Sequence, residues 1–320
     1  EFVIGTHALM QKGVEFSRLG LVIVDEQHRF GVGQRMNLLE KGGKHDKQAH
    51  QLIMTATPIP RTLAMTAYAG MDVSVIDELP PGRKPVTTVV MSNERRGEII
   101  QRIASACAGK RQAYWVCTLI EESDVIEAEA AEDVARNLKN SLGDLNIGLI
   151  HGRLKPSEKQ TIMDQFKSGK IHLLVATTVI EVGVDVPNAS LMIIENAERL
   201  GLAQLHQLRG RVGRGSEHSS CVLMYNPPLG GLAKQRLEIM RQTSDGFQIA
   251  EKDLELRGPG EVLGTRQTGM LLFRVADLSR DATLLKMIPA VADKIQNQHP
   301  EQADKLIRRW IGDASRFAGV

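Results

Sequence analysis

Two adjacent carboxylates, Asp25 and Glu26, directly follow the apolar run 21–24. Four apolar residues in a row are typical of a buried strand, and open α/β sheets place their ligands at the carboxyl ends of strands. One carboxylate at such an end can hold Mg²⁺ on a nucleoside triphosphate, while its neighbour orients or deprotonates the attacking water. Strand-end carboxylates also cap helices or lie in solvated turns. The pair is therefore a candidate nucleotide site only if other segments of the chain support it.

A second candidate segment, 55–62, carries Thr55 and Thr57 after another strand-like run. Their short hydroxyls can bond to a neighbouring carboxylate or to the backbone. The two prolines that follow prevent a helix from starting early. Taken alone, this pattern is more often a capped turn, and its position behind the two carboxylates is what makes it a candidate part of the same site.

The segment 206–215, HQLRGRVGRG, combines cations, an amide and three glycines. If residues 203–214 are largely helical, Gln207, Arg211 and Arg214 share one face through i, i+4 and i+7 spacing. The opposite, apolar face then consists of Leu205, Leu208 and Val212. Planar guanidiniums bind phosphate oxygens in forks and offset charge that develops during phosphoryl transfer. A solvated basic face is the alternative, but it explains poorly why glycines, which weaken helices, recur there.

Two further strand ends carry groups suited to nucleic-acid phosphates. In the segment 175–190, a strand ends at Thr177 and Thr178, and Gly183 and Asp185 follow. Hydroxyls and backbone N–H groups here could hold nucleic-acid phosphates, and Asp185 could bond a ribose hydroxyl. Arg153 follows a glycine after another strand-like run. A capped turn and a lone surface arginine remain the alternative interpretations.

These residues require a scaffold that brings several strand ends together. Strand-like and helix-like runs alternate over most of the chain, which predicts an α/β fold with doubly wound parallel sheets. The Pro/Gly-rich basic stretch 80–85 indicates an interdomain linker, with an ordinary long loop as the alternative. The predicted strands are 2–5, 21–25, 51–55 and 73–76 before this stretch, and 86–91, 112–118, 146–150, 171–176, 190–195 and 221–225 after it.

Helices are predicted between the later strands. Residues 94–108 and 131–142 both have helical periodicity. The second of these helices has an apolar face of Val134, Leu138 and Leu142. Ser157 and Gln160 suggest a capping box for a further helix. Its buried residues would be Ile162 and Phe166.

Composition bounds the class of protein. Of 320 residues 42% are hydrophobic, enough for real cores, and the net charge of +2 neither demands nor excludes nucleic acid. Cys107, Cys117 and Cys221 show no zinc or disulfide spacing, which favours a reducing compartment and small buried residues. No apolar run approaches the roughly 18 residues that span a bilayer, and no secretory signal is present. Because the chain starts at Glu1 with a strand-like run, it is expected to begin within a domain.

Together, these segments resemble the ordered motif set of superfamily-two helicases. DEQH at residues 25–28 resembles a DExH box, TAT at 55–57 resembles motif III, ATTVIEVGVDVP at 176–187 resembles motif V, and QLRGRVGR at 207–214 resembles motif VI. The segments DEQHRFGVGQR, TATPIPRT, VCTLIEES and ELRGPGEVLGTRQTG are similar to the RecG family of bacterial DNA helicases, the last of them to a translocation motif. The resemblance covers essentially the whole chain.

The resemblance implies two RecA-like lobes followed by a helical hairpin. The implied parts are 1–85, the C-terminal part of lobe 1; 86–235, lobe 2; and 236–320, the translocation hairpin with its loop and C-terminal helices. Asp25 would hold the Mg²⁺ of ATP, Glu26 would activate water, and Gln207, Arg211 and Arg214 would reach the γ-phosphate across the cleft. Coupling would involve His28, Thr55 and Thr57, and Gly183 and Asp185 would line the nucleotide site. DNA contacts and translocation would involve Thr6, His7, Arg153, Thr178, Arg257, Arg266 and Gln267.

One departure from the family matters. The sequence contains no G-x-x-x-x-G-K-[ST], the loop that supplies backbone N–H groups, a lysine and a magnesium-binding hydroxyl to the phosphates. The simplest account is a C-terminal fragment truncated inside the first lobe, with no appreciable ATPase activity of its own. The truncation should also leave the sheet of that lobe with an unpaired edge.

For the parent protein, the resemblance implies an ATP-driven double-stranded DNA translocase that remodels stalled forks and branched recombination junctions. ATP and Mg²⁺ would be its cofactors, and DNA junctions and forks its partners, with single-stranded-DNA-binding protein as a further suggested partner. It would be a monomer in the bacterial cytoplasm, associated with the nucleoid and not with a membrane.

Two rival interpretations stay open. The transcription-repair coupling factor carries a similar motor and translocation loop, but it would require an RNA-polymerase-binding module, and none is visible. A non-catalytic DNA-binding module is favoured by the missing phosphate loop. An in-frame GKT-type loop encoded shortly before Glu1 would support the truncated motor, whereas a start codon there would support the binding module. A dehydrogenase is excluded, because no G-x-G-x-x-G follows any predicted strand.

Overall fold

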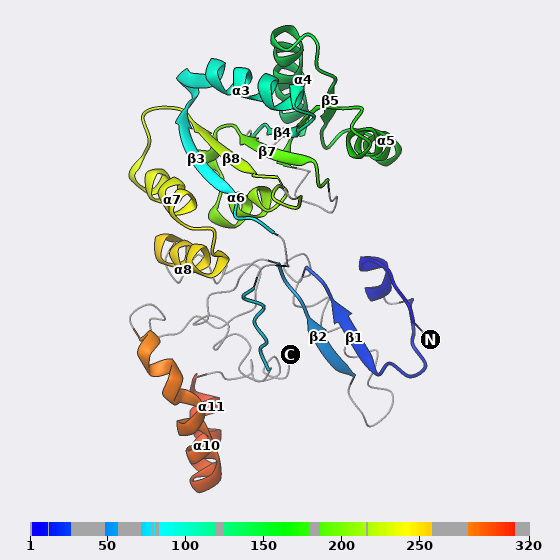
Figure 1. Ribbon diagram of the computed structural model, residues 1–320. Helices are drawn as coiled ribbons and strands as arrows, with labels where there is room; N and C mark the ends of the chain where they lie inside the picture. The colour runs from blue at the N-terminus through cyan, green and yellow to red at the C-terminus, as the bar shows by residue number, and fades with distance from the viewer. Residues whose placement is uncertain are drawn as a thin grey trace. The chain divides into compact units, whose positions relative to one another are not determined.

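A computed structural model describes residues 2–11, 13–26, 49–56, 72–78, 80, 83–118, 124–178, 186–215, 217–257 and 281–310. The chain forms two compact units. The first unit comprises Glu1–Ser74 and Leu254–Val320, and the second comprises Val75–Asp253. Figure 1 shows the elements of both. The sequence-based division into three parts stays a prediction.

The described part of the first unit contains a two-stranded parallel sheet. Strands β1 (Leu21–Val24) and β2 (His50–Ile53) pair with Val24 opposite Ile53. Its buried residues are Val22, Val24 and Ala49, against which Met10, Phe16 and Leu19 pack. A short 3₁₀ helix, η1 (His7–Met10), precedes β1. Both strands were expected from their apolar runs, and both are confirmed.

Two other expected strands in this region are wrong. Residues 2–5 and 73–76 do not form strands, and their apolar side chains are largely exposed, with Ile4 and Ile76 about nine-tenths accessible at 89% and 90%. A short apolar run becomes a strand only when another strand pairs with its backbone, and among the described residues neither run has such a neighbour.

Helices make up the C-terminal described part of the first unit. They are η6 (Ala282–Met287), α10 (Ile288–Gln298) and α11 (Pro300–Trp310). A single residue, His299, separates the last two helices, and its N–H donates to the Ile295 carbonyl at 2.8 Å. The helical character expected for this region is therefore confirmed.

The second unit is built on a six-stranded sheet in which every pairing is parallel. The strand order is β3-β8-β7-β4-β6-β5. The strands are β3 (Thr87–Ser92), β4 (Gln112–Val116), β5 (Ile147–Ile150), β6 (Leu173–Ala176), β7 (Ala189–Ile194) and β8 (Ser220–Tyr225). The predicted doubly wound parallel α/β fold is confirmed. Because all six strands are parallel, their carboxyl ends meet at one edge of the sheet.

Helices cover both faces of this sheet (Figure 1). On one face, α3 (Arg96–Ala108) and α4 (Asp124–Ser141) pack on a core that includes Trp115 and Leu173. On the other face, Phe166 of α5 (Pro156–Lys167) meets the ring of Tyr114 edge-on at 4.9 Å. The remaining helices are α6 (Leu202–Arg209), α7 (Gly231–Gln242) and α8 (Gly246–Arg257), and η3 (Asn93–Arg95) and η5 (Ala197–Arg199) are 3₁₀ turns.

The predicted capping box at Ser157 and Gln160 is wrong. The N-cap of the helix is Lys155, two residues before the predicted Ser157, and Pro156 is the first helical residue. The N–H of Lys155 donates to Glu158 Oε2 at 2.8 Å, so Glu158 supplies the cap. Proline suits this position because its missing N–H would have no helical partner there. The expected burial of Phe166 is confirmed, and Ile162 is half-buried.

All three cysteines are free and buried, as expected from their spacing. Among the described residues, no helix has both the length and the apolar character needed to cross a membrane.

Candidate functional site

The adjacent carboxylates stand at the carboxyl end of β1. The Glu26 N–H donates to Asp25 Oδ1 at 2.8 Å, and the Asp25 side chain is exposed. Glu26 has a φ of +53°, in the left-handed region that residues with a Cβ rarely adopt. Such a backbone costs about 1–3 kcal/mol and persists where the surroundings fix it, often at functional sites. The strand is thus followed directly by Asp25, whose carboxylate is exposed, and the next residue, Glu26, has a strained backbone.

The end of β2 brings a threonine hydroxyl to the same edge. The N–H of Met54 donates to the Val24 carbonyl at 2.8 Å, which continues the pairing of the two strands beyond Ile53. Thr55 therefore follows β2 where Asp25 and Glu26 follow β1, roughly one strand spacing of 4.8 Å away. Of the predicted coupling residues, only Thr55 is described; His28 and Thr57 lie outside the described residues.

Predicted DNA-contacting residues of the first unit are exposed where they are described. Thr6 precedes η1 and His7 begins it, and both side chains are accessible. Arg257 is the last residue of α8, and its side chain is not described. Arg266 and Gln267 lie outside the described residues.

The carboxyl edge of the six-stranded sheet carries the second group of predicted residues. Arg153 is exposed beyond β5, and Thr178 is half-buried beyond β6. The pairing of Ile150 with Ala176 makes these two strands direct neighbours, so the structure brings Arg153 and Thr178 to one edge. Gly183 and Asp185 lie outside the described residues.

Two buried polar residues lie at this edge: Thr177, whose hydroxyl was a candidate from the sequence, and His151, to which sequence reasoning gave no role. His151 and Thr177 are the first residues after β5 and β6 and are only 7% and 2% exposed. Within the described part of the chain, neither His151 Nδ1 nor Thr177 Oγ1 has a hydrogen-bond partner. The usable signal for His151 was its place directly after an apolar strand, two residues ahead of Arg153.

The arginine-bearing segment, residues 207–214, differs from the prediction in one important respect. Helix α6 ends at Arg209, with Gly210 as its C-cap, so Gln207, Arg211 and Arg214 do not share one helical face. Gln207 lies on the last helical turn, and Arg211 follows in a turn closed by its N–H donating to the Leu208 carbonyl at 3.0 Å. The predicted apolar face is nevertheless confirmed, because Leu205, Leu208 and Val212 are all fully buried.

The structure explains why glycine occupies two positions at the end of this segment, Gly213 and Gly215. Gly213 has a φ of +80°, and a Cβ there would lie 2.7 Å from Val86 Cγ2. A Cβ on Gly215 would collide with the Pro187 carbonyl oxygen. The helix therefore gives way to a tight path that only glycine can follow, and this path decides where Arg214 emerges.

Replacing Gly213 with alanine should lower the free energy of unfolding by about 1–3 kcal/mol, because a left-handed backbone and the contact with Val86 both penalise a Cβ. Urea unfolding of the chain measures this loss. Gly97→Ala is the matched control, since Gly97 lies in α3 with open space around a new Cβ. It should raise stability slightly; equal effects of the two substitutions would contradict the explanation.

Arg209, which sequence reasoning missed, anchors the end of α6. It is 3% exposed, and its Nη1 donates to the carbonyls of Met240 at 2.9 Å and Thr243 at 2.8 Å, at the C-terminal end of α7. Its Nη2 lies 3.1 Å from His206 Nδ1. Burial chiefly, aided by the charge of Arg209, lowers the pKa of His206 to about 4, so a neutral ring can accept this bond at pH 7. The signal was its position four residues after Leu205 on the buried side of the helix.

No cluster of three or more His, Cys, Asp or Glu side chains that could hold a metal ion occurs among the described residues. A magnesium ion bound mainly through nucleotide phosphates and water needs only one or two protein carboxylates. The exposed carboxylate of Asp25 suits that mode of binding.

Comparison with known proteins places these features in a family. Residues 95–216 match the helicase conserved C-terminal domain, and residues 243–308 match the C-terminal part of domain 3 of the ATP-dependent DNA helicase RecG. RecG of Pasteurella multocida is 64% identical over 321 residues, covering 100% of this chain and 46% of the relative. RecG of Escherichia coli K12 is 62% identical with the same coverage. The chain belongs to the RecG family.

The chain spans about half the length of these RecG relatives. A structure of RecG bound to a three-way DNA junction matches 88% of this chain and 36% of its own, with 46% identity and a TM-score of 0.65. A structure of Mss116p bound to single-stranded RNA and AMP-PNP matches 78% of this chain and 54% of its own, with 18% identity and a TM-score of 0.55. At this identity the likeness supports the fold alone.

Proposed function

We propose that this chain contributes part of the motor of an ATP-dependent double-stranded DNA translocase that remodels stalled replication forks and branched recombination junctions. One observation carries the proposal: the 46%-identical RecG structure that matches most of this chain is bound to a three-way DNA junction. A three-way junction has the branch geometry of a replication fork, so it represents the substrate class that we propose.

The first unit would act on the nucleotide through the end of β1. The exposed Asp25 carboxylate would ligate the Mg²⁺ of MgATP, and Glu26 would orient the attacking water and take its proton. MgATP would supply the phosphoryl group whose transfer to water releases the free energy for movement. His28, Thr55 and Thr57 would connect the nucleotide state to the grip on DNA.

The second unit would supply the positively charged groups that bind the phosphates. Gln207, Arg211 and Arg214 would donate hydrogen bonds to phosphate oxygens, and the guanidiniums would offset the charge that builds up on them. Gly183 and Asp185 would line the nucleotide site. Hydrolysis would then need the carboxylates and the guanidiniums together, which is how it would be coupled to a change in the grip on DNA.

DNA contacts would come from Thr6, His7, Arg153, Thr178, Arg257, Arg266 and Gln267. Of these, Thr6, His7 and Arg153 are exposed and Thr178 is half-buried. Thr177 and the newly recognised His151 would join them. Among the described residues, Thr177 Oγ1 and His151 Nδ1 have no hydrogen-bond partner. This favours a ligand atom, because burying a polar group without a hydrogen bond costs about 1–3 kcal/mol. We further propose a monomer in the bacterial cytoplasm, associated with the nucleoid and in contact with single-stranded-DNA-binding protein.

This chain alone should hydrolyse ATP no faster than background, because it contains no G-x-x-x-x-G-K-[ST] to bind the phosphates. A steady-state ATPase assay with a three-way junction measures this, with the full-length protein under the same conditions as the positive control. The full-length protein should also separate the strands of the junction and be stimulated by it.

Two outcomes of this experiment count against the proposal, and they differ in meaning. Turnover by the chain close to that of the full-length protein would sink the idea that the missing loop disables it. A full-length protein whose ATPase ignores branched DNA would instead contradict the proposed motor function itself.

A further inference from the structure

The turn that links β7 to η5 consists of Glu195 and Asn196, and both residues adopt costly states. Burial raises the pKa of the Glu195 carboxyl, although the Arg96 guanidinium opposes this shift. A carboxyl with a raised pKa loses stabilising free energy as the pH rises through that pKa, so a charged Glu195 opposes folding. Asn196 has a φ of +46°, in the left-handed region. Two consecutive residues in unfavourable states indicate that this turn is kept for more than stability.

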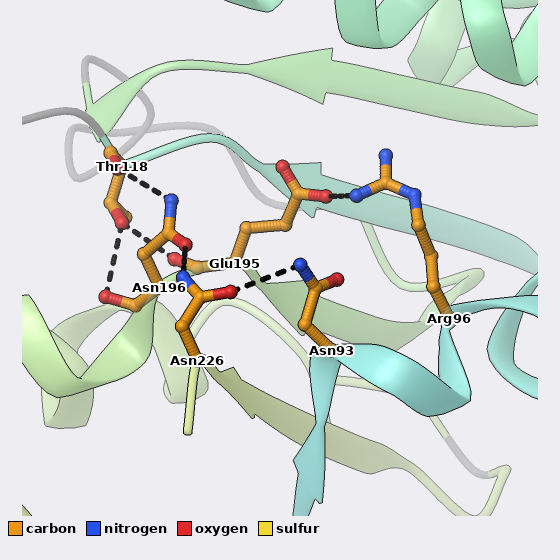
Figure 2. A network of polar contacts seen from close by, with 6 residues as sticks. All are labelled: Asn93, Arg96, Thr118, Glu195, Asn196 and Asn226. Atoms are coloured by element: carbon orange, nitrogen blue, oxygen red, sulfur yellow. Dashed lines mark hydrogen bonds and ion pairs between the residues drawn. The ribbon is translucent and has the colours of Figure 1, made fainter. Parts of the chain in front are cut away.

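A network of polar contacts ties the turn to residues that follow three other strands (Figure 2). Thr118, just beyond β4, donates through Oγ1 to the Glu195 carbonyl at 2.5 Å and accepts at its own carbonyl from Asn196 Nδ2 at 3.1 Å. Asn226, just beyond β8, donates to Asn196 Oδ1 at 2.5 Å. Asn93, just beyond β3, donates to Asn226 Oδ1 at 3.1 Å. The carboxyl ends of β3, β8, β7 and β4 are therefore tied together at this turn.

Helix α3 adds a charged contact from one side. Arg96 Nη1 forms an ion pair with Glu195 Oε1, and the Arg96 guanidinium lies over the Trp115 ring with its carbon 4.8 Å from the ring centre. The stacked guanidinium is held in one orientation by the fully buried Trp115. The carboxylate of Glu195 is thus tied to a fixed point on a neighbouring helix.

The turn leads directly to the arginine-bearing segment. Only five residues separate Asn196 from Leu202, where α6 begins. Ala197, Leu200 and Leu202 in this connection are buried, and Arg236 of α7 donates to the Glu198 carbonyl at 2.8 Å. A connection this short and this well packed transmits a shift of the turn to α6, and so to Gln207, Arg211 and Arg214.

We propose that Glu195 and Asn196, with Arg96 as the ion-pair partner, are positioning residues that set where the arginine-bearing segment presents its guanidiniums. This inference rests on the proposed motor function and adds three residues to it. It also accounts for the choice of side chains, because well-packed apolar residues usually stabilise a core better than a buried ion pair does. The pair is retained for a defined geometry that loose apolar packing would not impose.

The test uses full-length protein with Asn196→Gly and, separately, Glu195→Gln. Glycine accepts the left-handed backbone without strain but removes both side-chain bonds, and glutamine keeps the shape of Glu195 but removes its charge. We expect each substitution to lower kcat for DNA-stimulated ATP hydrolysis by about tenfold, since small displacements of groups that act in the transition state are costly. KM for ATP and the binding of a fluorescent ADP analogue should stay within about twofold.

Two matched controls separate positioning from general damage. Lys110→Gly makes the same change at another left-handed residue, with φ +62°, on the turn between α3 and β4. Glu98→Gln breaks an exposed ion pair with Arg95 at 2.7 Å on α3. Both should leave kcat unchanged, and thermal unfolding should verify that all four variants are folded at the assay temperature.

Unchanged kcat in both network variants would overturn the inference, as would losses that merely follow a drop in melting temperature. Glu26→Gln and Arg214→Ala in the same protein separate this from a failure of the proposed function. If these two abolish hydrolysis while the network variants do not, only the positioning role is lost. If Glu26→Gln, Arg214→Ala and both network variants all leave hydrolysis unchanged, the proposed motor function is contradicted as well.

Discussion

Full-length protein carrying Glu26→Gln should hydrolyse ATP about 10²–10⁴-fold more slowly than the parent protein, the range that removal of a general base produces. Glutamine retains the size and hydrogen-bonding shape of glutamate but cannot accept the proton of the attacking water. The left-handed backbone at Glu26, with φ +53°, should be kept, since it belongs to the strand end and not to the charge. Steady-state hydrolysis with a three-way junction measures the loss.

The same variant should bind nucleotide and DNA with affinities close to those of the parent, because Asp25 and the residues proposed to contact DNA are untouched. Glu129→Gln is a suitable control, since Glu129 is an exposed residue of α4 in the second unit. It should leave turnover unchanged. A Glu26→Gln protein that turns over at the parent rate would show that another group activates the water.

The strands of the second unit were predictable because their apolar runs are buried on both faces. All five residues of β4, Gln112–Val116, are buried, and β6 is buried throughout. Such strands occur in parallel sheets covered by helices, and they appear in a sequence as continuous apolar segments. The alternation with helices then predicted the doubly wound arrangement.

The wrongly predicted strands expose the limit of that reasoning. The runs at 2–5 and 73–76 each contain three large apolar residues, against four in β1, yet their apolar side chains are largely exposed. Strand formation depends on a neighbouring backbone, which is not a property of the run itself. A local pattern therefore predicts that a segment is compatible with a strand, and tertiary pairing decides whether it is one.

The arginine-bearing segment shows a subtler limit. Periodicity correctly predicted that Val212 is buried, although the backbone has already left the helix at Gly210. The turn happens to return Val212 to the core, so the apolar spacing continues while the helical geometry does not. The positive φ at Gly213 leaves no trace in a hydrophobic pattern. Glycine content was the only local warning, and it pointed to the correct place.

Long-range polar contacts could not be predicted at all. Arg209 bonds to carbonyls more than 30 residues further along the chain, at Met240 and Thr243. The pair Arg96–Glu195 joins residues separated by 99 positions. No local pattern in one sequence specifies such partners, because they depend on how helices and strands pack. Sequence reasoning therefore proposed a set of reacting groups, but it could not identify the long-range partners formed by Arg209 and by the Arg96–Glu195 pair.

The largest loss is expected for Arg214→Ala, which should lower kcat of the full-length protein by about 10³-fold or more, as for other arginines that stabilise phosphoryl transfer. KM for ATP should change much less, because the guanidinium acts mainly when charge builds up in the transition state. Arg214 lies beyond the left-handed Gly213 and is exposed, and its Nε donates to the Gly210 carbonyl at 3.3 Å. Because the Arg214 side chain is exposed, the fold should survive its removal.

Arg214→Lys distinguishes charge from geometry at this position. Lysine keeps the positive charge but cannot donate two parallel hydrogen bonds from a planar fork, so it should restore only a small part of the lost kcat. Arg136→Ala is the control for removing an exposed arginine, since Arg136 pairs with Asp133 at 2.9 Å on the surface of α4; such pairs contribute at most about 1 kcal/mol to stability. Nearly full activity of Arg214→Ala, with Arg211→Ala inactive, would assign the transition-state contact to Arg211 alone. Full activity of both variants would remove the arginine-bearing segment from the reaction, and with it the reason for the turn at Gly213 to be so tightly specified.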